Sequence, residues 1–166
     1  MNRRLAVSVL FSLLVTGAAF AQVGSSATAT ASAFAKVITP ITITKTADLN
    51  FGTIISGPAG TVTVSPAGLE TASGASIVSP NPNVSAAQFN VTGEPSTAYS
   101  ISLPSSITIS NGAQTMTVDN FTTNPTPSGL LSGLGAQSLQ VGARLSVLAN
   151  QAVGSYSGTF SVTVAY

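Results

Sequence analysis

Hydrophobic and polar residues alternate along much of the chain, and this period of two is that of a β-strand, whose side chains point to opposite faces in turn. The clearest example is GSYSGTFSVTVAY at Gly154–Tyr166, where an aromatic, aliphatic or glycine residue occupies every second position from Tyr156. This pattern predicts a long central strand with Phe160, Val162 and Val164 in the core. Such a strand needs a neighbour along each edge, from the same molecule or from another.

The same alternation predicts most of the other strands. They cover Thr61–Val64, Ala87–Thr92, Ala98–Leu103, Ile107–Ser110, Thr115–Thr122 and Ser138–Val147. The last of these alternates through Leu139, Val141, Ala143, Leu145 and Val147. The turn residues Gly93–Ser96 lie between Ala87–Thr92 and Ala98–Leu103, which predicts a hairpin. The inward phase slips by one residue at Phe121, which predicts a β-bulge near Asp119–Asn120.

No stretch repeats apolar residues with the 3.6-residue period of a helix. Predicted strands instead recur about every 8–12 residues with turn residues between them, a spacing typical of antiparallel sandwiches and barrels. The alternation favours a sandwich of two sheets, each with one solvent-facing side. We therefore expect a single all-β antiparallel sandwich domain at residues 36–166.

The first segment, Met1–Ala21, has the composition of a signal peptide. Arg3 and Arg4 precede the apolar run Leu5–Val15, and Ala19–Ala21 matches a small-x-small cleavage pattern. The apolar run is too short to span a bilayer, which takes about 20 residues. The pattern predicts an exported protein of the periplasm, cell surface or extracellular space, without a membrane span after cleavage.

Residues 22–35 are small and polar and form an arm ahead of the domain. Alanine recurs at alternate positions of this arm, at Ala27, Ala29, Ala31 and Ala33. One interpretation is a flexible exported terminus, because few large apolar groups are present to order it. The other is a donor strand that adds to a sheet edge in its own or another molecule.

Only 5% of the residues are charged, against about 25% in ordinary soluble domains. After the signal peptide the chain has three basic and four acidic residues, a formal net charge of −1. No basic patch is present to neutralise phosphates, so nucleic acid is not an expected partner. Weak charge repulsion instead suits a protein that packs against copies of itself.

The chain contains neither Cys nor His. This excludes disulfides, Ser-His-Asp and Cys-His catalytic sites, and zinc sites with nitrogen or sulfur ligands. The carboxylates Asp48, Glu70, Glu94 and Asp119 are interpreted as turn or strand-end acids rather than as a catalytic pair or calcium ligands. Tyr156 follows a Gly turn, the placement of a structural tyrosine corner. We expect no enzymatic activity and no cofactor or metal.

Three stretches resemble the bacterial exported family catalogued as domain of unknown function 4402. They are DLNFG at Asp48–Gly52, AQFNVTGEPSTAYSISLP at Ala87–Pro104 and the closing GSYSGTFSVTVAY. The resemblance covers roughly residues 35–166. The pattern is also similar to spore coat protein U and to chaperone–usher fimbrial subunits, which share an LxFG segment and a Tyr-ended last strand. It implies an immunoglobulin-like sandwich at the periplasm or cell surface.

The fimbrial resemblance further implies sites of assembly. Such subunits lack a final strand of their own and accept the N-terminal arm of the next subunit. The implied donor here lies in Gln22–Phe34, and the implied assembly strand, recognised by a periplasmic chaperone, presents Phe160, Val162, Val164 and Tyr166. Two features depart from that pattern: many such subunits carry a disulfide, and their arms carry large hydrophobic residues where this arm carries alanine.

Two functions from different classes follow. The first is a non-enzymatic structural or adhesive surface protein, a fimbria- or coat-like subunit that self-associates by strand addition or works with a periplasmic assembly partner. The second is a monomeric periplasmic or extracellular ligand-binding module of the carbohydrate type. Trp is absent and Tyr occurs only three times. This favours the first function, because carbohydrate sites use aromatic platforms.

Overall fold

The computed structural model describes residues 24–166, so the predicted signal peptide lies outside the described residues. By its internal contacts the chain divides into two units, Met1–Lys36 and Val37–Tyr166. Residues 24–40 are exposed and carry neither helix nor strand. All regular structure within the described range therefore belongs to the second unit.

The second unit contains twelve strands, and residues 24–166 contain no helix. The strands are β1 (Thr42–Ala47), β2 (Ile54–Ile55), β3 (Gly60–Val64), β4 (Glu70–Ser73), β5 (Ser76–Ile77), β6 (Ala87–Thr92), β7 (Ala98–Ser102), β8 (Ser106–Ser110), β9 (Thr115–Asn124), β10 (Ser128–Leu130), β11 (Ala136–Val147) and β12 (Thr163–Ala165). Each pairing between them is antiparallel. The expected all-β antiparallel class is confirmed.

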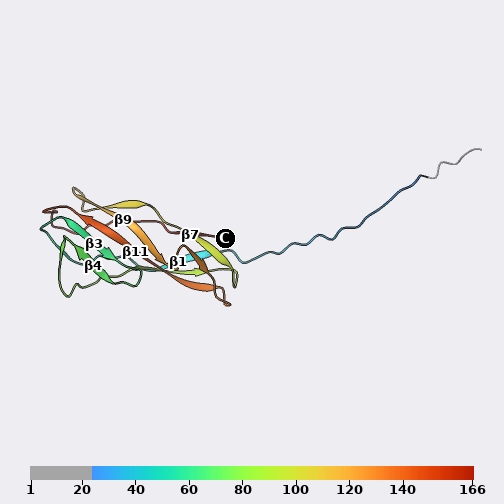
Figure 1. The fold of residues 1–166 in the computed structure, drawn as a ribbon, viewed down its shortest axis with the longest axis horizontal. Helices are drawn as coiled ribbons and strands as arrows, with labels where there is room; N and C mark the ends of the chain where they lie inside the picture. The colour runs from blue at the N-terminus through green and yellow to red at the C-terminus, as the bar shows by residue number, and fades with distance from the viewer. Residues whose placement is uncertain (1–23) are drawn as a thin grey trace, which may run out of the picture. The chain divides into compact units, whose positions relative to one another are not determined.

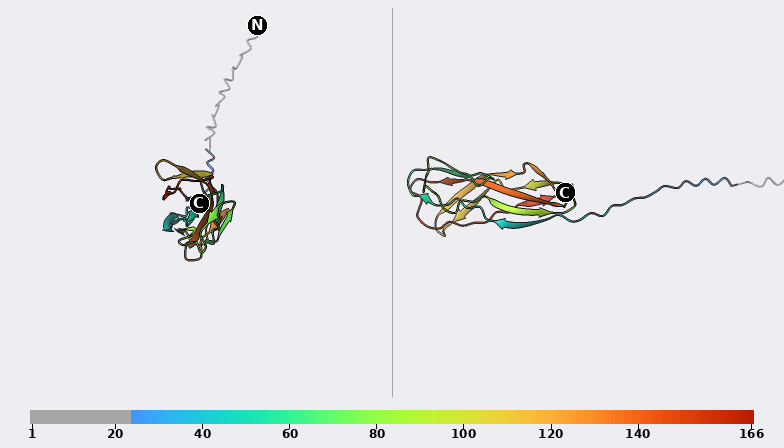
Figure 2. Two further views of the ribbon diagram at one scale, coloured as in Figure 1. Left: turned by 90° about the vertical axis from the view of Figure 1, so that its left-hand side faces the viewer. Right: turned by 90° about the horizontal axis from the view of Figure 1, so that it is seen from below.

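The strands form three sheets of unequal size. Seven of them make one large sheet in the order β1-β6-β11-β3-β4, with β9 and then β8 added at β11. A three-stranded sheet has the order β10-β7-β12, and β2 pairs with β5. The large sheet curls into a half-barrel, and the left view of Figure 2 shows its strands wrapping around the long axis of the domain.

β11 is the central strand of the large sheet. One of its edges pairs with β9 from Gln140 to Ser146. The opposite edge is shared, because β6 occupies its first half and β3 its second half. Figure 1 shows β11 running between β9 and β3. The change of partner falls at Gly142, where a side chain would meet the backbone of Val64 and Ser65 at the end of β3.

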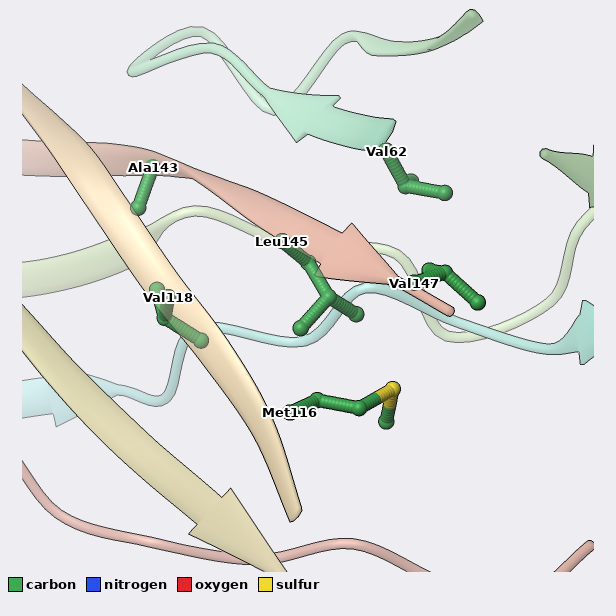
Figure 3. Close-up of a cluster of buried hydrophobic side chains, with 6 residues drawn as sticks. All are labelled: Val62, Met116, Val118, Ala143, Leu145 and Val147. Carbon is green, nitrogen blue, oxygen red and sulfur yellow. The ribbon is translucent and has the colours of Figure 1, made fainter. Parts of the chain in front are cut away.

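The buried face of β11 joins the two halves of the core. Leu139 and Val141 belong to a cluster with residues of β6 and β7. Ala143, Leu145 and Val147 belong to a second cluster with Val62 of β3 and with Met116 and Val118 of β9, drawn in Figure 3. All five β11 residues are buried. The alternation predicted for Ser138–Val147 is confirmed residue by residue.

The predicted bulge in β9 is also confirmed. Gly142 pairs with Thr122 and Arg144 with Asp119, so Asn120 and Phe121 together oppose one residue of β11. Asn120 takes a left-handed conformation with φ of 48°. The extra residue restores the inward phase at Phe121, whose ring contacts both core clusters.

The hairpin predicted from Ala87–Thr92 and Ala98–Leu103 is wrong, although both strands exist. β6 pairs with β1 and β11 in the large sheet, whereas β7 pairs with β10 and β12 in the small one. The connection between them bonds elsewhere: Gly93 N donates to Gly135 O, and Ser96 N donates to Ser132 O. Both edges of β6 are already filled, so the chain crosses to the other sheet at this turn.

The long central strand predicted at Gly154–Tyr166 is wrong as well. Within this segment only β12, at Thr163–Ala165, is a strand, and it pairs with β7 alone at the edge of the small sheet. Ser157 adds an isolated bridge to Ser110. The segment does have two faces, with Phe160, Val162 and Val164 half-buried and the residues between them exposed. Periodicity, however, carries no information about the presence of a ladder partner.

The buried hydroxyl of Tyr99 on β7 has no hydrogen-bond partner within residues 24–166. Burial also raises the pKa of this phenol, since the charged form would lose its hydration. A buried polar atom without a partner costs about 1–3 kcal/mol of desolvation. We therefore expect Tyr99→Phe to keep or raise the free energy of unfolding in urea denaturation. A clear loss of stability would show that the hydroxyl is bonded in solution.

The shared edge of β11 makes Gly142 intolerant of a side chain. We expect Gly142→Ala to lower the free energy of unfolding by roughly 1–3 kcal/mol, as overpacked positions do, because β3 must shift away from β11. Gly133→Ala is the matched control, since a side chain there meets nothing within 4 Å. Equal urea midpoints for the two variants would contradict this account of the β11 edge.

Candidate functional site

A groove of about 730 Å³ opens over the concave face of the large sheet. One wall is the continuous segment of residues 48–56, and the other is the continuous segment of residues 151–160. The floor is apolar and is supplied by four strands, β6, β8, β9 and β11. Its residues are Ala87, Phe89, Ile107, Ile109, Met116, Val118, Leu145 and Val147. Met116, Val118, Leu145 and Val147 appear in Figure 3.

The wall formed by residues 48–56 is fixed by backbone and side-chain hydrogen bonds. Asn50 exchanges two backbone bonds with Ser85, of 2.9 and 3.0 Å. Its side-chain oxygen accepts from Gly52 N at 2.8 Å, which makes the local turn. Asn81 Oδ1 accepts from Thr53 N at 2.6 Å. This wall is therefore held in place along most of its length.

The C-terminal segment, residues 151–166, contains the second wall at residues 151–160. This segment has the side-chain pattern of a strand but almost no ladder. Phe160, Val162 and Val164 are half-buried against the β6–β7 cluster, while the residues between them are exposed. Phe160 also packs on Phe121 with ring centroids 5.1 Å apart. Among the described residues, residues 158–162 have no strand pairing. Their backbone is therefore left for water or for a further strand beside the groove.

Tyr156 fixes the start of this wall. Its hydroxyl donates to Ala152 O at 2.7 Å and accepts from Gln151 Nε2 at 2.9 Å. Gln151 is buried, and its Nε2 lies 3.4 Å from Thr115 O on β9. A tyrosine hydroxyl bonded to the backbone a few residues upstream matches the hydrogen bond of a tyrosine corner, although no strand begins at Tyr156.

Tyr166 fixes the other end of the segment. Its hydroxyl donates to Thr39 O at 3.0 Å and accepts from Glu94 N at 2.5 Å. Thr39 N in turn donates to a carboxylate oxygen of Glu94 at 3.1 Å. Gly93 leaves the space that the hydroxyl occupies, since a side chain there would overlap it. The three residues Thr39, Glu94 and Tyr166 close a small polar ring.

The carboxylates are engaged in separate local pairs. Asp48 accepts from Lys45 at 2.6 Å, and Glu70 accepts from Asn81 at 2.7 Å. Asp119 accepts two bonds from Arg144 across the β9–β11 ladder, at 2.9 and 3.1 Å. The Arg144 hydrogen bonds hold the pKa of Asp119 below its ordinary value. With both its oxygens occupied, Asp119 fits its structural interpretation better than that of a calcium ligand.

The groove presents two kinds of surface. Its floor is hydrophobic, and one of its walls carries backbone groups without ladder partners. Between residues 24 and 166, no three acidic, His or Cys residues gather as a metal-binding group. The same part of the chain contains no helix long and apolar enough to cross a bilayer. An extended peptide or an apolar ligand is the kind of molecule that such a groove accepts.

The sequence-predicted site residues are only partly brought together. Phe160, Val162 and Val164 share one face of the C-terminal segment, and Tyr166 is about half exposed at its end. The arm residues Ala27, Ala29, Ala31 and Ala33 are exposed and lie in no strand. The groove itself was not predicted, because it depends on which segments lack ladders. The buried Gln151 had no sequence signal either, since it lies in a polar linker.

The fold and groove together define an antiparallel β domain with an apolar-floored groove between two chain segments. The sequence profile of the family described as "Domain of unknown function (DUF4402)" matches residues 41–166. The chain therefore belongs to this family. No curated protein and no solved structure matches the chain.

The alternating burial of the C-terminal wall can be tested with a pair of charged variants. We expect Val162→Asp to lower the free energy of unfolding by roughly 1–3 kcal/mol, because the carboxylate is placed against the apolar cluster. The adjacent Ser161 is exposed, so Ser161→Asp should leave the urea midpoint nearly unchanged. If both variants unfold at the same midpoint, the assignment of the two faces fails.

Proposed function

We propose that this protein is an exported, non-enzymatic structural or adhesive surface protein that assembles by strand addition. One observation carries the proposal: residues 158–162 have strand alternation but no ladder, and the first three of them, residues 158–160, line an apolar groove. Backbone groups in that condition are a template for an incoming strand. An added strand would pair with this wall while its alternate side chains entered the groove.

The proposed fold is an immunoglobulin-like sandwich that is completed on assembly. The tyrosine corner at Tyr156 supports this, since immunoglobulin-like domains carry one near the start of a late strand. In the present arrangement the large sheet forms a half-barrel and the small sheet is separate. The chain passes from the first to the second between β6 and β7. A strand placed between the two walls would continue the layer opposite the large sheet.

The proposed donor is the arm of a second copy, Gln22–Ala35. Residues 24–35 are exposed and lie in no strand, and from Ala27 to Ala35 alanine alternates with mostly polar residues. Small side chains suit a donor that enters a groove whose floor is already lined by large residues. Donation from one copy to the next is a head-to-tail contact, which extends into an open filament when it does not close into a ring. A periplasmic chaperone would occupy the same wall before assembly.

A monomeric ligand-binding module is the second candidate. The groove volume of about 730 Å³ lies within the range of small-molecule pockets, which is about 300–1,000 Å³. Its aromatic lining is limited to Phe51, Phe89, Tyr156 and Phe160. Only Tyr156 combines a ring with a polar group, and its hydroxyl already has two partners. This leaves little for carbohydrate recognition and favours the strand-addition function.

Size-exclusion chromatography of the mature chain with and without Gln22–Ala35 tests the proposal. We expect the complete mature chain to form species larger than a monomer as its concentration rises. Deletion of the arm should abolish them, because the donor is removed while the core is kept. A mature chain that stays monomeric at high concentration would contradict assembly and favour the ligand-binding module.

Two arm variants give the matched control for this experiment. Ala29→Asp with Ala31→Asp places charges on the alanine face that would enter the groove, and it should prevent association. Thr28→Asp with Thr30→Asp adds the same charge to the opposite face and should retain association. Equal loss in both variants would indicate that added charge, rather than the alanine face, controls association.

A further inference from the structure

We propose that the hydroxyl groups of Tyr156 and Tyr166 are positioning groups that preset the acceptor wall, so that residues 158–162 are held for pairing before a strand arrives. The inference rests on the proposed strand addition and assigns these two residues a role in it. The second copy's arm remains the occupant of the groove.

The two hydroxyls bracket the part of the wall that has no ladder. Tyr156 is tied to Ala152 and Gln151 at one end of the groove. Tyr166 is tied to Thr39 and Glu94 at the other end of the segment. Between them the described chain supplies one bridge at Ser157 and the short ladder of β12 with β7. Residues 158–162 therefore have no ladder of their own and lie between two ends that hydrogen bonds hold in place.

The side chains of residues 158–162 hold one face of the segment on the core but do not orient its backbone N–H and C=O groups. Phe160 and Val162 pack on the core and keep the segment against the domain. Half-buried apolar contacts are not directional, so they do not set which backbone groups point along the groove. Hydrogen bonds are directional, and those at the two tyrosines restrict the ends of the segment. Ordering an acceptor in advance lowers the cost of binding and strengthens association.

The anchoring bonds differ from ordinary core contacts in one testable respect. Tyr→Phe removes only the hydroxyl and keeps the ring, so packing of Tyr156 on the β9–β11 cluster is preserved. Tyr99 provides the matched control, because its buried hydroxyl has no partner among the described residues. Comparison with Tyr99→Phe thus distinguishes the effect of losing an anchoring hydrogen bond from the effect of losing any tyrosine hydroxyl.

The test uses the mature full-length chain with Tyr156→Phe and Tyr166→Phe combined, compared with Tyr99→Phe and wild type. Sedimentation velocity over a concentration series gives the association constant, and far-ultraviolet circular dichroism together with the urea midpoint checks the fold. Loss of both anchors should weaken association about tenfold, which corresponds to about 1.4 kcal/mol. Tyr99→Phe should associate as wild type does. A folded double variant that associates within twofold of wild type overturns the inference.

Hydrogen exchange by mass spectrometry on the same samples separates this inference from the proposed function. In the monomer at low concentration, peptides covering Ser157 and Thr163–Ala165, which are paired at either end of residues 158–162, should exchange several times faster in the double variant than in wild type. Unchanged exchange overturns the anchoring role even if wild type assembles. Faster exchange with a wild type that never assembles supports the anchoring and contradicts strand addition. If the double variant loses its far-ultraviolet signal, the same comparison is made with the two single variants, and unchanged exchange in both overturns the inference.

Discussion

The shared edge of β11 is the constraint on which the rest of the domain depends. Three strands, β9, β6 and β3, must reach this one strand, and two of them divide a single edge at Gly142. Each half of β11 then contributes to a different core cluster. The bulge opposite Ala143 and the cross-strand pair of Asp119 with Arg144 lie at the same junction. Sheet order, core and curvature thus meet within a few residues.

The curvature produced at this junction has a consequence for the concave face. A curled sheet needs a second layer, but the small sheet of β10, β7 and β12 covers only one part of it. The remaining cover is made by two chain segments with little ladder, one after β1 that contains only the short β2 and one before β12. A groove follows wherever two such segments do not pair with each other. The groove is therefore a product of incomplete pairing in the second layer.

Local pattern was sufficient for the parts of the fold that local chemistry determines. The inward residues of β11, the bounds of β6 and the bulge at Asn120 all follow from alternation and its change of phase. Pairing partners did not follow, because they depend on which edges are already filled by distant strands. The assumed β6–β7 hairpin failed for this reason. The long strand at Gly154–Tyr166 failed for the same reason, and the groove beside it could not be foreseen.

The polar ring of Thr39, Glu94 and Tyr166 has a mechanical meaning if copies are joined through their arms. Tension transmitted along an arm would reach Thr39 before it reaches the ladder of β1 with β6. The Tyr166 hydroxyl would pass part of that load into β12 and β7, while the Glu94 contacts would pass part into the β6–β7 connection. Force would then be divided between two sheets instead of peeling one edge strand from the domain.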